Sequence, residues 1–378
     1  MTLMDMGSGY NNPPGPGQGT QRNISEAVDS FAQRVELHSK HDQFATAHSI
    51  LGAAPDLEMD RRAPYSLATK VLLAVLNIIF FLIGKVYKVV MRNEKLVRRE
   101  MGPRWLNKLL GILIHPYVEI VREGVTTSAA LDALYAANRF FPGHLDALRH
   151  SPWWYRIPRT LGARLCWWVA NLSGPEAVRN RLRLVFVQFH GELKRLVEEG
   201  VEELQLLSLA CGSAEATIYA VWHLLREYPD VKVKLTLVDL SRDSLDRARR
   251  LAQALSVDDH VEIVRSSAEK FWNDERHGRF HVVEMVGFLD YRDEKWVRTS
   301  SESVRALLHP GGLYVSAHIA PEVDAATTRW LIGWPLLVRR TEAEFCRLLT
   351  EGGWNGNEIT TLSDPRHVHT VALCRKSA

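Results

Sequence analysis

Short apolar runs alternate with helical stretches from about residue 196 to the C-terminus, and this alternation restricts the possible folds more than any other feature. The runs are rich in β-branched residues, which is typical of buried strands. When strands alternate with crossover helices, they build a parallel, doubly wound sheet. We therefore predict an α/β fold with an antiparallel strand at its end. The predicted strands are 204–210, 233–240, 261–265, 280–288 and 312–319, with two more within 358–376.

The sequence before the sheet divides into two further parts. Residues 7–19 are nearly all Gly, Pro, Asn or Gln and cannot bury apolar surface, so we expect 1–23 to be a disordered tail. Residues 24–195 show helical patterns, which predict a helical cap or membrane-proximal region. The sheet domain then occupies 196–378. A length of 378 residues is consistent with more than one domain.

Composition excludes several classes of protein. A net charge of +3 is too small to indicate a nucleic-acid partner. The N-terminus lacks the apolar core of a secretory signal, so we expect a cytoplasmic protein. The cysteines show no CxxC pair and no Cys/His spacing suited to zinc, so no metal site is predicted. They are Cys166, Cys211, Cys346 and Cys374.

An apolar segment at 71–84 runs into a helix with a basic stripe, and two interpretations remain open. The segment is shorter than the roughly 20 residues that a membrane span requires. Residues 71–99 are suited to peripheral contact with an anionic membrane, or they form a buried helix with a solvated continuation, which we favour. The stripe consists of Lys85, Lys88, Arg92, Lys95 and Arg99.

Four tryptophans gather between residues 150 and 170. Most tryptophans in such positions are core residues, although some line apolar pockets. With 71–84 they favour an apolar or lipid-like ligand over a polar metabolite. They are Trp153, Trp154, Trp167 and Trp168.

The loop "ACGSAEA" (210–216) follows the first predicted strand, where doubly wound sheets bind ligands. A dinucleotide fingerprint does not fit, because Glu215 would stand at its third glycine. A P-loop lysine is also missing. Small residues at Ala210, Gly212 and Ala214 suit a ligand that approaches the backbone closely without a phosphate. The two alanines are tolerable if their φ angles stay negative.

The later strands supply polar groups at the same edge. Asp239 ends the second strand, where it can accept hydrogen bonds from two ribose hydroxyls. "SSAEKF" (266–271) follows the third strand, where a polar side chain can meet an adenine amino group. "FHVVEMVGFLDY" (280–291) contains the fourth strand. "LLHPGGLYVSAHI" (307–319) reads as a helix end, a Pro-Gly-Gly turn and the fifth strand.

In this order and spacing, residues 200–378 resemble the class I S-adenosylmethionine-dependent methyltransferases. The resemblance implies a Rossmann-like methyltransferase sheet, S-adenosyl-L-methionine as cofactor and a small-molecule substrate. Two residues depart from the usual pattern: Ser208 stands where many members have Asp or Glu, and Ser267 where Asp is common. The cofactor residues implied are Ser208, Ala210, Cys211, Gly212, Ser213, Ala214, Asp239, Leu240, Ser267, Ala268, Glu269, Met285 and Gly287.

"GFLDYRD", "SAHIAP" and "RWLIGWPLLVRRTEAEF" resemble a bacterial subgroup associated with 3-hydroxy fatty-acid methyl ester synthesis. This resemblance implies O-methylation of a carboxylate. A carboxylate is already ionised at pH 7, so it requires a positioning cation, which Arg339 or Arg340 could supply, rather than a base. His318 stands where we expect Asn.

Two alternatives remain open. An amine or hydroxyl acceptor would use a proton acceptor, for which Asp290, Tyr291 and His318 are candidates. A non-catalytic, membrane-associated scaffold with a methyltransferase fold would bind S-adenosylhomocysteine weakly or not at all.

Overall fold

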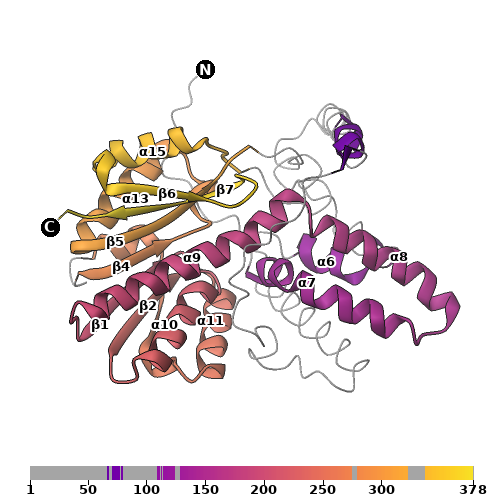
Figure 1. The fold of residues 1–378 in the computed structure, drawn as a ribbon, viewed down its shortest axis with the longest axis horizontal. Helices are drawn as coiled ribbons and strands as arrows, with labels where there is room; N and C mark the ends of the chain where they lie inside the picture. Colours follow the sequence, from indigo (N-terminus) through magenta and orange to yellow (C-terminus); the bar gives the residue numbers. More distant parts are fainter. Residues whose placement is uncertain are drawn as a thin grey trace.

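The computed structural model describes residues 66–67, 70–76, 78–79, 109–110, 112, 114–123, 128–274, 279–321 and 337–377. The predicted tail at 1–23 and the basic stripe of 85–99 lie outside these residues. In Figure 1 a group of helices lies beside a sheet that is covered by helices. None of the described helices is long and apolar enough to cross a membrane.

The helical part contains α6 (Pro116–Glu123), α7 (Ser128–Leu148), α8 (Trp153–Val169) and α9 (Ser173–Glu198). Phe141 and Leu134 of α7 pack against Ala163 and Cys166 of α8 in a small separate core. α9 is the long helix that runs from this group onto the sheet (Figure 1), where it packs against α10 and β7. It continues past residue 195, where the sequence places the domain boundary.

Within the described residues, the sheet contains seven strands in the order β3-β2-β1-β4-β5-β7-β6, and β7 runs antiparallel to both of its neighbours. This confirms the predicted α/β fold with a doubly wound sheet and a helical region before it. The strands are β1 (Glu203–Leu209), β2 (Lys232–Asp239), β3 (Val261–Arg265), β4 (Phe280–Met285), β5 (Leu308–Ile319), β6 (Ile359–Ser363) and β7 (His369–Arg375).

Two apolar layers hold helices on the two faces of the sheet. One layer packs α9, α10 (Glu215–Glu227) and α11 (Arg242–Ala254) onto it. The other packs α12, α13 and α15 onto the opposite face. These three helices are Ala268–Trp272, Glu294–Leu307 and Glu342–Glu351.

The Pro-Gly-Gly segment differs from the prediction of a turn before the fifth strand. β5 already begins at Leu308, which pairs with Phe280, whereas the next pairing joins Leu313 to Val282. The extra residues bulge out of the strand, and Gly311 has a φ of +76° that glycine adopts without strain. Its N–H donates to the carbonyl of Lys376 at 2.9 Å, so the bulge is tied to the end of the chain.

Candidate active site

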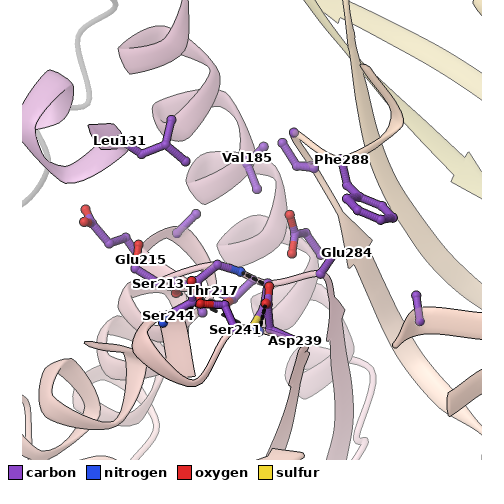
Figure 2. Close-up of a pocket in the computed structure, with 18 of the residues that line it drawn as sticks. Leu131, Val185, Ser213, Glu215, Thr217, Asp239, Ser241, Ser244, Glu284 and Phe288 are labelled. Carbon is purple, nitrogen blue, oxygen red and sulfur yellow. Dashed lines mark hydrogen bonds between the residues drawn. The ribbon is translucent and has the colours of Figure 1, made fainter. Parts of the chain in front are cut away.

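A cavity of about 470 Å³ opens at the carboxyl ends of β1 to β4, where the strand order reverses between β1 and β4. Such a reversal is the usual ligand site of doubly wound sheets. The α7 and α9 helices complete the walls (Figure 2). Many of the residues predicted for the cofactor lie here: Ala210, Cys211, Gly212, Ser213, Ala214, Asp239, Leu240, Ser267, Ala268, Glu269 and Gly287.

The loop after β1 turns through three residues with left-handed backbone. Ala210, Gly212 and Ala214 have φ angles of 50°, 57° and 54°. The condition under which the two alanines are tolerable, a negative φ, is therefore not met. An alanine in this region costs on the order of 1 kcal/mol, so other contacts must hold the loop.

Asp239 at the end of β2 supplies those contacts. Its Oδ2 accepts a hydrogen bond from the N–H of Gly212 at 3.0 Å, and its Oδ1 accepts from Ser241 at 2.7 Å (Figure 2). Burial raises the pKa of this carboxyl, while the backbone donors oppose the shift. Asp239 thus links two adjacent strand ends and fixes the loop.

The segment "SSAEKF", which we predicted to contact the adenine of the cofactor, forms the start of α12. The Ser267 hydroxyl accepts from the N–H of Lys270 at 3.1 Å and so caps this short helix. Glu269 accepts a hydrogen bond from the indole of Trp296 at 2.5 Å. Both side chains are held in place at the cavity wall.

Glu284 of β4 was not predicted from the sequence, yet its carboxylate reaches into the cavity (Figure 2). It accepts a hydrogen bond from the hydroxyl of Ser208, the residue with which it pairs across the two strands. The side chain is almost completely buried, and burial raises its pKa to about 7. Glu284 on β4 therefore places a carboxylate next to Ser208 on β1, the position where the resemblance leads us to expect an acidic residue. The sequence signal was a glutamate within an otherwise apolar strand.

Ser208 and Met285 do not line the cavity as predicted. Ser208 is fully buried beneath Glu284. Met285 lies in the core on the opposite face of the sheet, with Val283. Since side chains alternate along a strand, the face that presents Glu284 to the cavity turns Met285 away from it.

Arg181 of α9 also lines the cavity and was not predicted. Its Nη1 lies 4.0 Å from Oδ2 of Asp290, and both side chains are buried. Gly287, with a φ of +80°, leaves the space for it, because a Cβ there would lie 3.0 Å from Nη2 of Arg181. A helix about a hundred residues earlier in the chain thus brings a buried cation to this cavity.

Of the four predicted catalytic residues, the structure brings only Tyr291 to the cavity wall. Asp290 is buried and accepts from the N–H of Ile319 at 2.9 Å. Burial raises its pKa to about 6, while Arg181 opposes the shift. Asp290 therefore joins the chain after β4 to the end of β5.

Arg340 and His318 are buried and do not line the cavity. Arg340 is buried and donates to the carbonyls of Leu289 and Arg292. His318 is buried beside the ring of Phe345, and burial lowers its pKa to about 4. Asp290, His318 and Arg340 are thus absent from the lining of this cavity.

Asp132 of α7 joins the helical part to the cofactor loop. It accepts from the hydroxyl of Ser213 at 3.2 Å and pairs with Arg247 of α11 at 3.0 Å. Leu131 and Tyr135 of the same helix line the cavity. No cluster of metal-ligating side chains occurs among the described residues.

Comparisons with known proteins give one family match. Residues 206–312 match the model of a methyltransferase domain. This matched segment contains the loop after β1, Asp239 and Glu284. No curated protein matches the chain.

Similar solved structures are distant. A possible exported protein from Bordetella parapertussis has 16% identity and a TM-score of 0.47, covering 74% of this chain and 99% of its own. An O-methyltransferase family protein from Burkholderia thailandensis has 15% identity and a TM-score of 0.40, covering 66% and 72%. Magnesium protoporphyrin IX methyltransferase from Synechocystis PCC 6803, solved with bound S-adenosylmethionine, has 12% identity and a TM-score of 0.39, covering 54% and 83%.

These similarities are too distant to carry a property of those proteins to this chain. The domain match stands on its own and lies on the strands and loops that form the cavity. Residues 206–312 are a methyltransferase domain, and the chain is an S-adenosylmethionine-dependent methyltransferase.

Proposed function

We propose that the cavity holds S-adenosylmethionine between the loop after β1 and the ends of β2, β3 and β4. The loop lets the ligand approach the backbone at Gly212, and Asp239 keeps acceptor capacity for ribose hydroxyls. Glu284 and Glu215 add carboxyl groups to the wall. An acidic wall suits a cofactor that carries a sulfonium and an ammonium group, because buried opposite charges attract strongly.

We also propose that the helices within 24–195 form a cap over the methyltransferase domain. Leu131 and Tyr135 supply part of the cavity wall, and Asp132 binds the loop and α11 at once. Such a cap excludes water from the transferred methyl group, which strengthens the electrostatic interactions in the site.

The acceptor that fits the cavity best is a carboxylate on a small apolar molecule. Arg181 supplies a buried cation, and this observation carries the proposal. Leu131, Val185 and Phe288 provide apolar parts of the cavity wall (Figure 2). This proposal assigns to Arg181 the role that we predicted for Arg340 from the sequence. The subgroup resemblance makes 3-hydroxy fatty acids the first acceptors to test.

The reaction requires alignment rather than a base. A carboxylate oxygen attacks the methyl carbon as the carbon–sulfur bond breaks, which gives a methyl ester and S-adenosylhomocysteine with no proton transfer. Holding the two reactants in line supplies much of the acceleration. An arginine fork can fix both oxygens of a carboxylate.

A second candidate function is methylation of a hydroxyl or amine, which Tyr291 favours because it lines the cavity. Such an acceptor must lose a proton during or after the transfer. The phenolate form of Tyr291 would accept that proton, whereas Asp290 and His318 do not line the cavity.

Two variants separate these candidates. We expect Arg181→Lys to lower turnover with a carboxylate acceptor at least tenfold, because lysine keeps the charge but loses the fork. Cofactor affinity should stay unchanged, and Tyr291→Phe should have little effect. Turnover is measured by mass spectrometry of methyl esters formed from a panel of straight-chain and 3-hydroxy fatty acids. A loss of 100-fold in Tyr291→Phe beside a harmless Arg181→Lys contradicts the carboxylate mechanism.

Asp239→Ala should weaken cofactor binding by about 1–3 kcal/mol, since the variant loses hydrogen bonds to a charged acceptor. The loop also loses the partner of the Gly212 N–H. Calorimetry with S-adenosylhomocysteine measures the change. Asp258→Ala removes an exposed carboxylate remote from the cavity and serves as the matched control. Equal affinities in the two variants argue against a cofactor role for Asp239.

A further inference from the structure

α8 presents an apolar face to solvent that includes Trp153 and Trp154, contrary to the expectation that these two belong to the core. Trp154, Ile157, Leu161 and Leu165 recur at steps of three and four residues, so they lie along one side of the helix. Trp153 lies beside Trp154 at the helix start. We call these five residues the α8 outer face. The exposed fractions of these side chains are 69% for Trp153, 65% for Trp154, 54% for Ile157, 63% for Leu161 and 43% for Leu165.

The opposite side of α8 already has its packing partner. Ala163, Cys166 and Ala170 are buried in the core that α8 shares with α7. Gly162 lies against the carbonyl of Ile114 so closely that a Cβ would stand 1.8 Å from this oxygen. Trp167 and Val169 of α8 pack against the same core. The helix is therefore fixed to the protein along this side, and the large apolar residues of the α8 outer face are left outside. Figure 1 shows α8 at the outer edge of the molecule, far from the sheet.

The charges of α8 indicate what covers this face. The helix contains Arg156, Arg159 and Arg164 and no acidic residue. Arg156 and Arg164 are exposed, and Nη1 of Arg156 donates to the carbonyl of Arg149 at 3.3 Å. Tryptophan with arginine is typical of helices that lie in the interface of an anionic bilayer, where indole rings occupy the headgroup level.

A second copy of the chain suits this surface less well. Symmetric dimers pair like surfaces, and two α8 helices would bring arginines together with no acidic residue on either helix to balance them. Anionic lipid headgroups complement the same arginines directly. We propose that the α8 outer face binds an anionic lipid surface, independently of the acceptor that the enzyme methylates.

The test is flotation of the full chain with vesicles of phosphatidylcholine, with and without phosphatidylglycerol, at low and high salt. We expect binding to the anionic vesicles that falls as salt rises. Trp154→Ser with Leu161→Ser should reduce the partition at least tenfold. Arg156→Gln with Arg164→Gln should reduce it about thirtyfold at low salt, at about fivefold for each cation near the surface.

Matched variants keep the result specific to α8. Val187→Ser with Val338→Ser changes two exposed apolar residues on other elements and should leave flotation unchanged. Val75→Ser with Ile78→Ser tests the exposed apolar residues near the N-terminus, which belong to the alternative membrane contact at 71–99. Thermal unfolding and S-adenosylhomocysteine binding of all variants should match the parent protein.

Three results overturn the proposal. The first is no flotation with anionic vesicles at low salt. The second is flotation that is lost in Val75→Ser with Ile78→Ser but kept in the α8 variants. The third is a change from dimer to monomer in Trp154→Ser with Leu161→Ser, measured by light scattering, because it would show that a second copy covers the face.

Discussion

Glu284→Gln should raise the free energy of unfolding of the ligand-free protein by about 3 kcal/mol at pH 8. Burial raises the pKa of Glu284 from 4.5 to about 7 in the folded state. The native protein thus binds more protons than the unfolded chain between these values, and stability falls as pH rises through them. A shift of this size corresponds to about 3 kcal/mol. Glutamine keeps the shape and cannot ionise.

Urea denaturation at pH 5 and pH 8 measures this effect. The difference between the parent protein and Glu284→Gln should be small at pH 5, where Glu284 is protonated in the native state, and full at pH 8. Glu262→Gln is the control, because that carboxylate is about half exposed and lies 2.9 Å from Lys234 on the neighbouring strand. An equal response of the two variants at pH 8 contradicts a buried, destabilising charge at Glu284.

The same variant should bind the cofactor at least tenfold more weakly. The buried carboxylate of Glu284 destabilises the ligand-free protein, and we interpret this loss of stability as a consequence of its role in binding a cationic ligand. Functional residues often lower stability in this way. A comparison of two ligands locates the contact. Weaker binding of S-adenosylmethionine alone indicates a contact with the sulfonium. Equal weakening of S-adenosylhomocysteine indicates the ammonium, which both ligands carry. Unchanged affinity for both ligands contradicts the role of Glu284.

Gly212→Val should lower methyl transfer at least 100-fold. Gly212 has a φ of 57°, a conformation that a β-branched residue avoids, and its N–H donates to Asp239. It also lines the cavity, so a side chain there meets the cofactor. Transfer of a radiolabelled methyl group measures the loss.

Gly200→Val separates backbone strain from blockage of the cavity. Gly200 has a φ of 86°, lies outside the cavity lining and has open space where a Cβ would stand. We expect this control to lose some stability and to keep its activity. Comparable losses of activity in the two variants show that strain alone explains the effect at Gly212.

The sequence predicted what depends on local pattern. Alternating apolar runs located the strands, and the small residues at 210–214 located the ligand loop, because both properties follow from neighbours in the chain. The positive φ angles of Ala210 and Ala214 were missed, since a contact with Asp239 from another strand holds the loop.

The rest depended on contacts that sequence order does not reveal. Glu284 became part of the cavity through its pairing with Ser208, and Arg181 through the path of α9 across the sheet. The guanidinium of Arg340 could bind a carboxylate, yet it donates to the backbone carbonyls of Leu289 and Arg292. Trp153 and Trp154 at the start of α8 were interpreted as core residues, but they are exposed, and the core contacts of that helix come from residues further along it, such as Ala163, Cys166 and Trp167.

The central claim is that this cavity binds S-adenosylmethionine, and calorimetry with S-adenosylhomocysteine on the purified full chain tests it most directly. We predict one binding event per chain, weakened by about 1–3 kcal/mol in Asp239→Ala and unchanged in Asp258→Ala. Absence of binding to the parent protein, or equal affinity in all three proteins, would contradict the account.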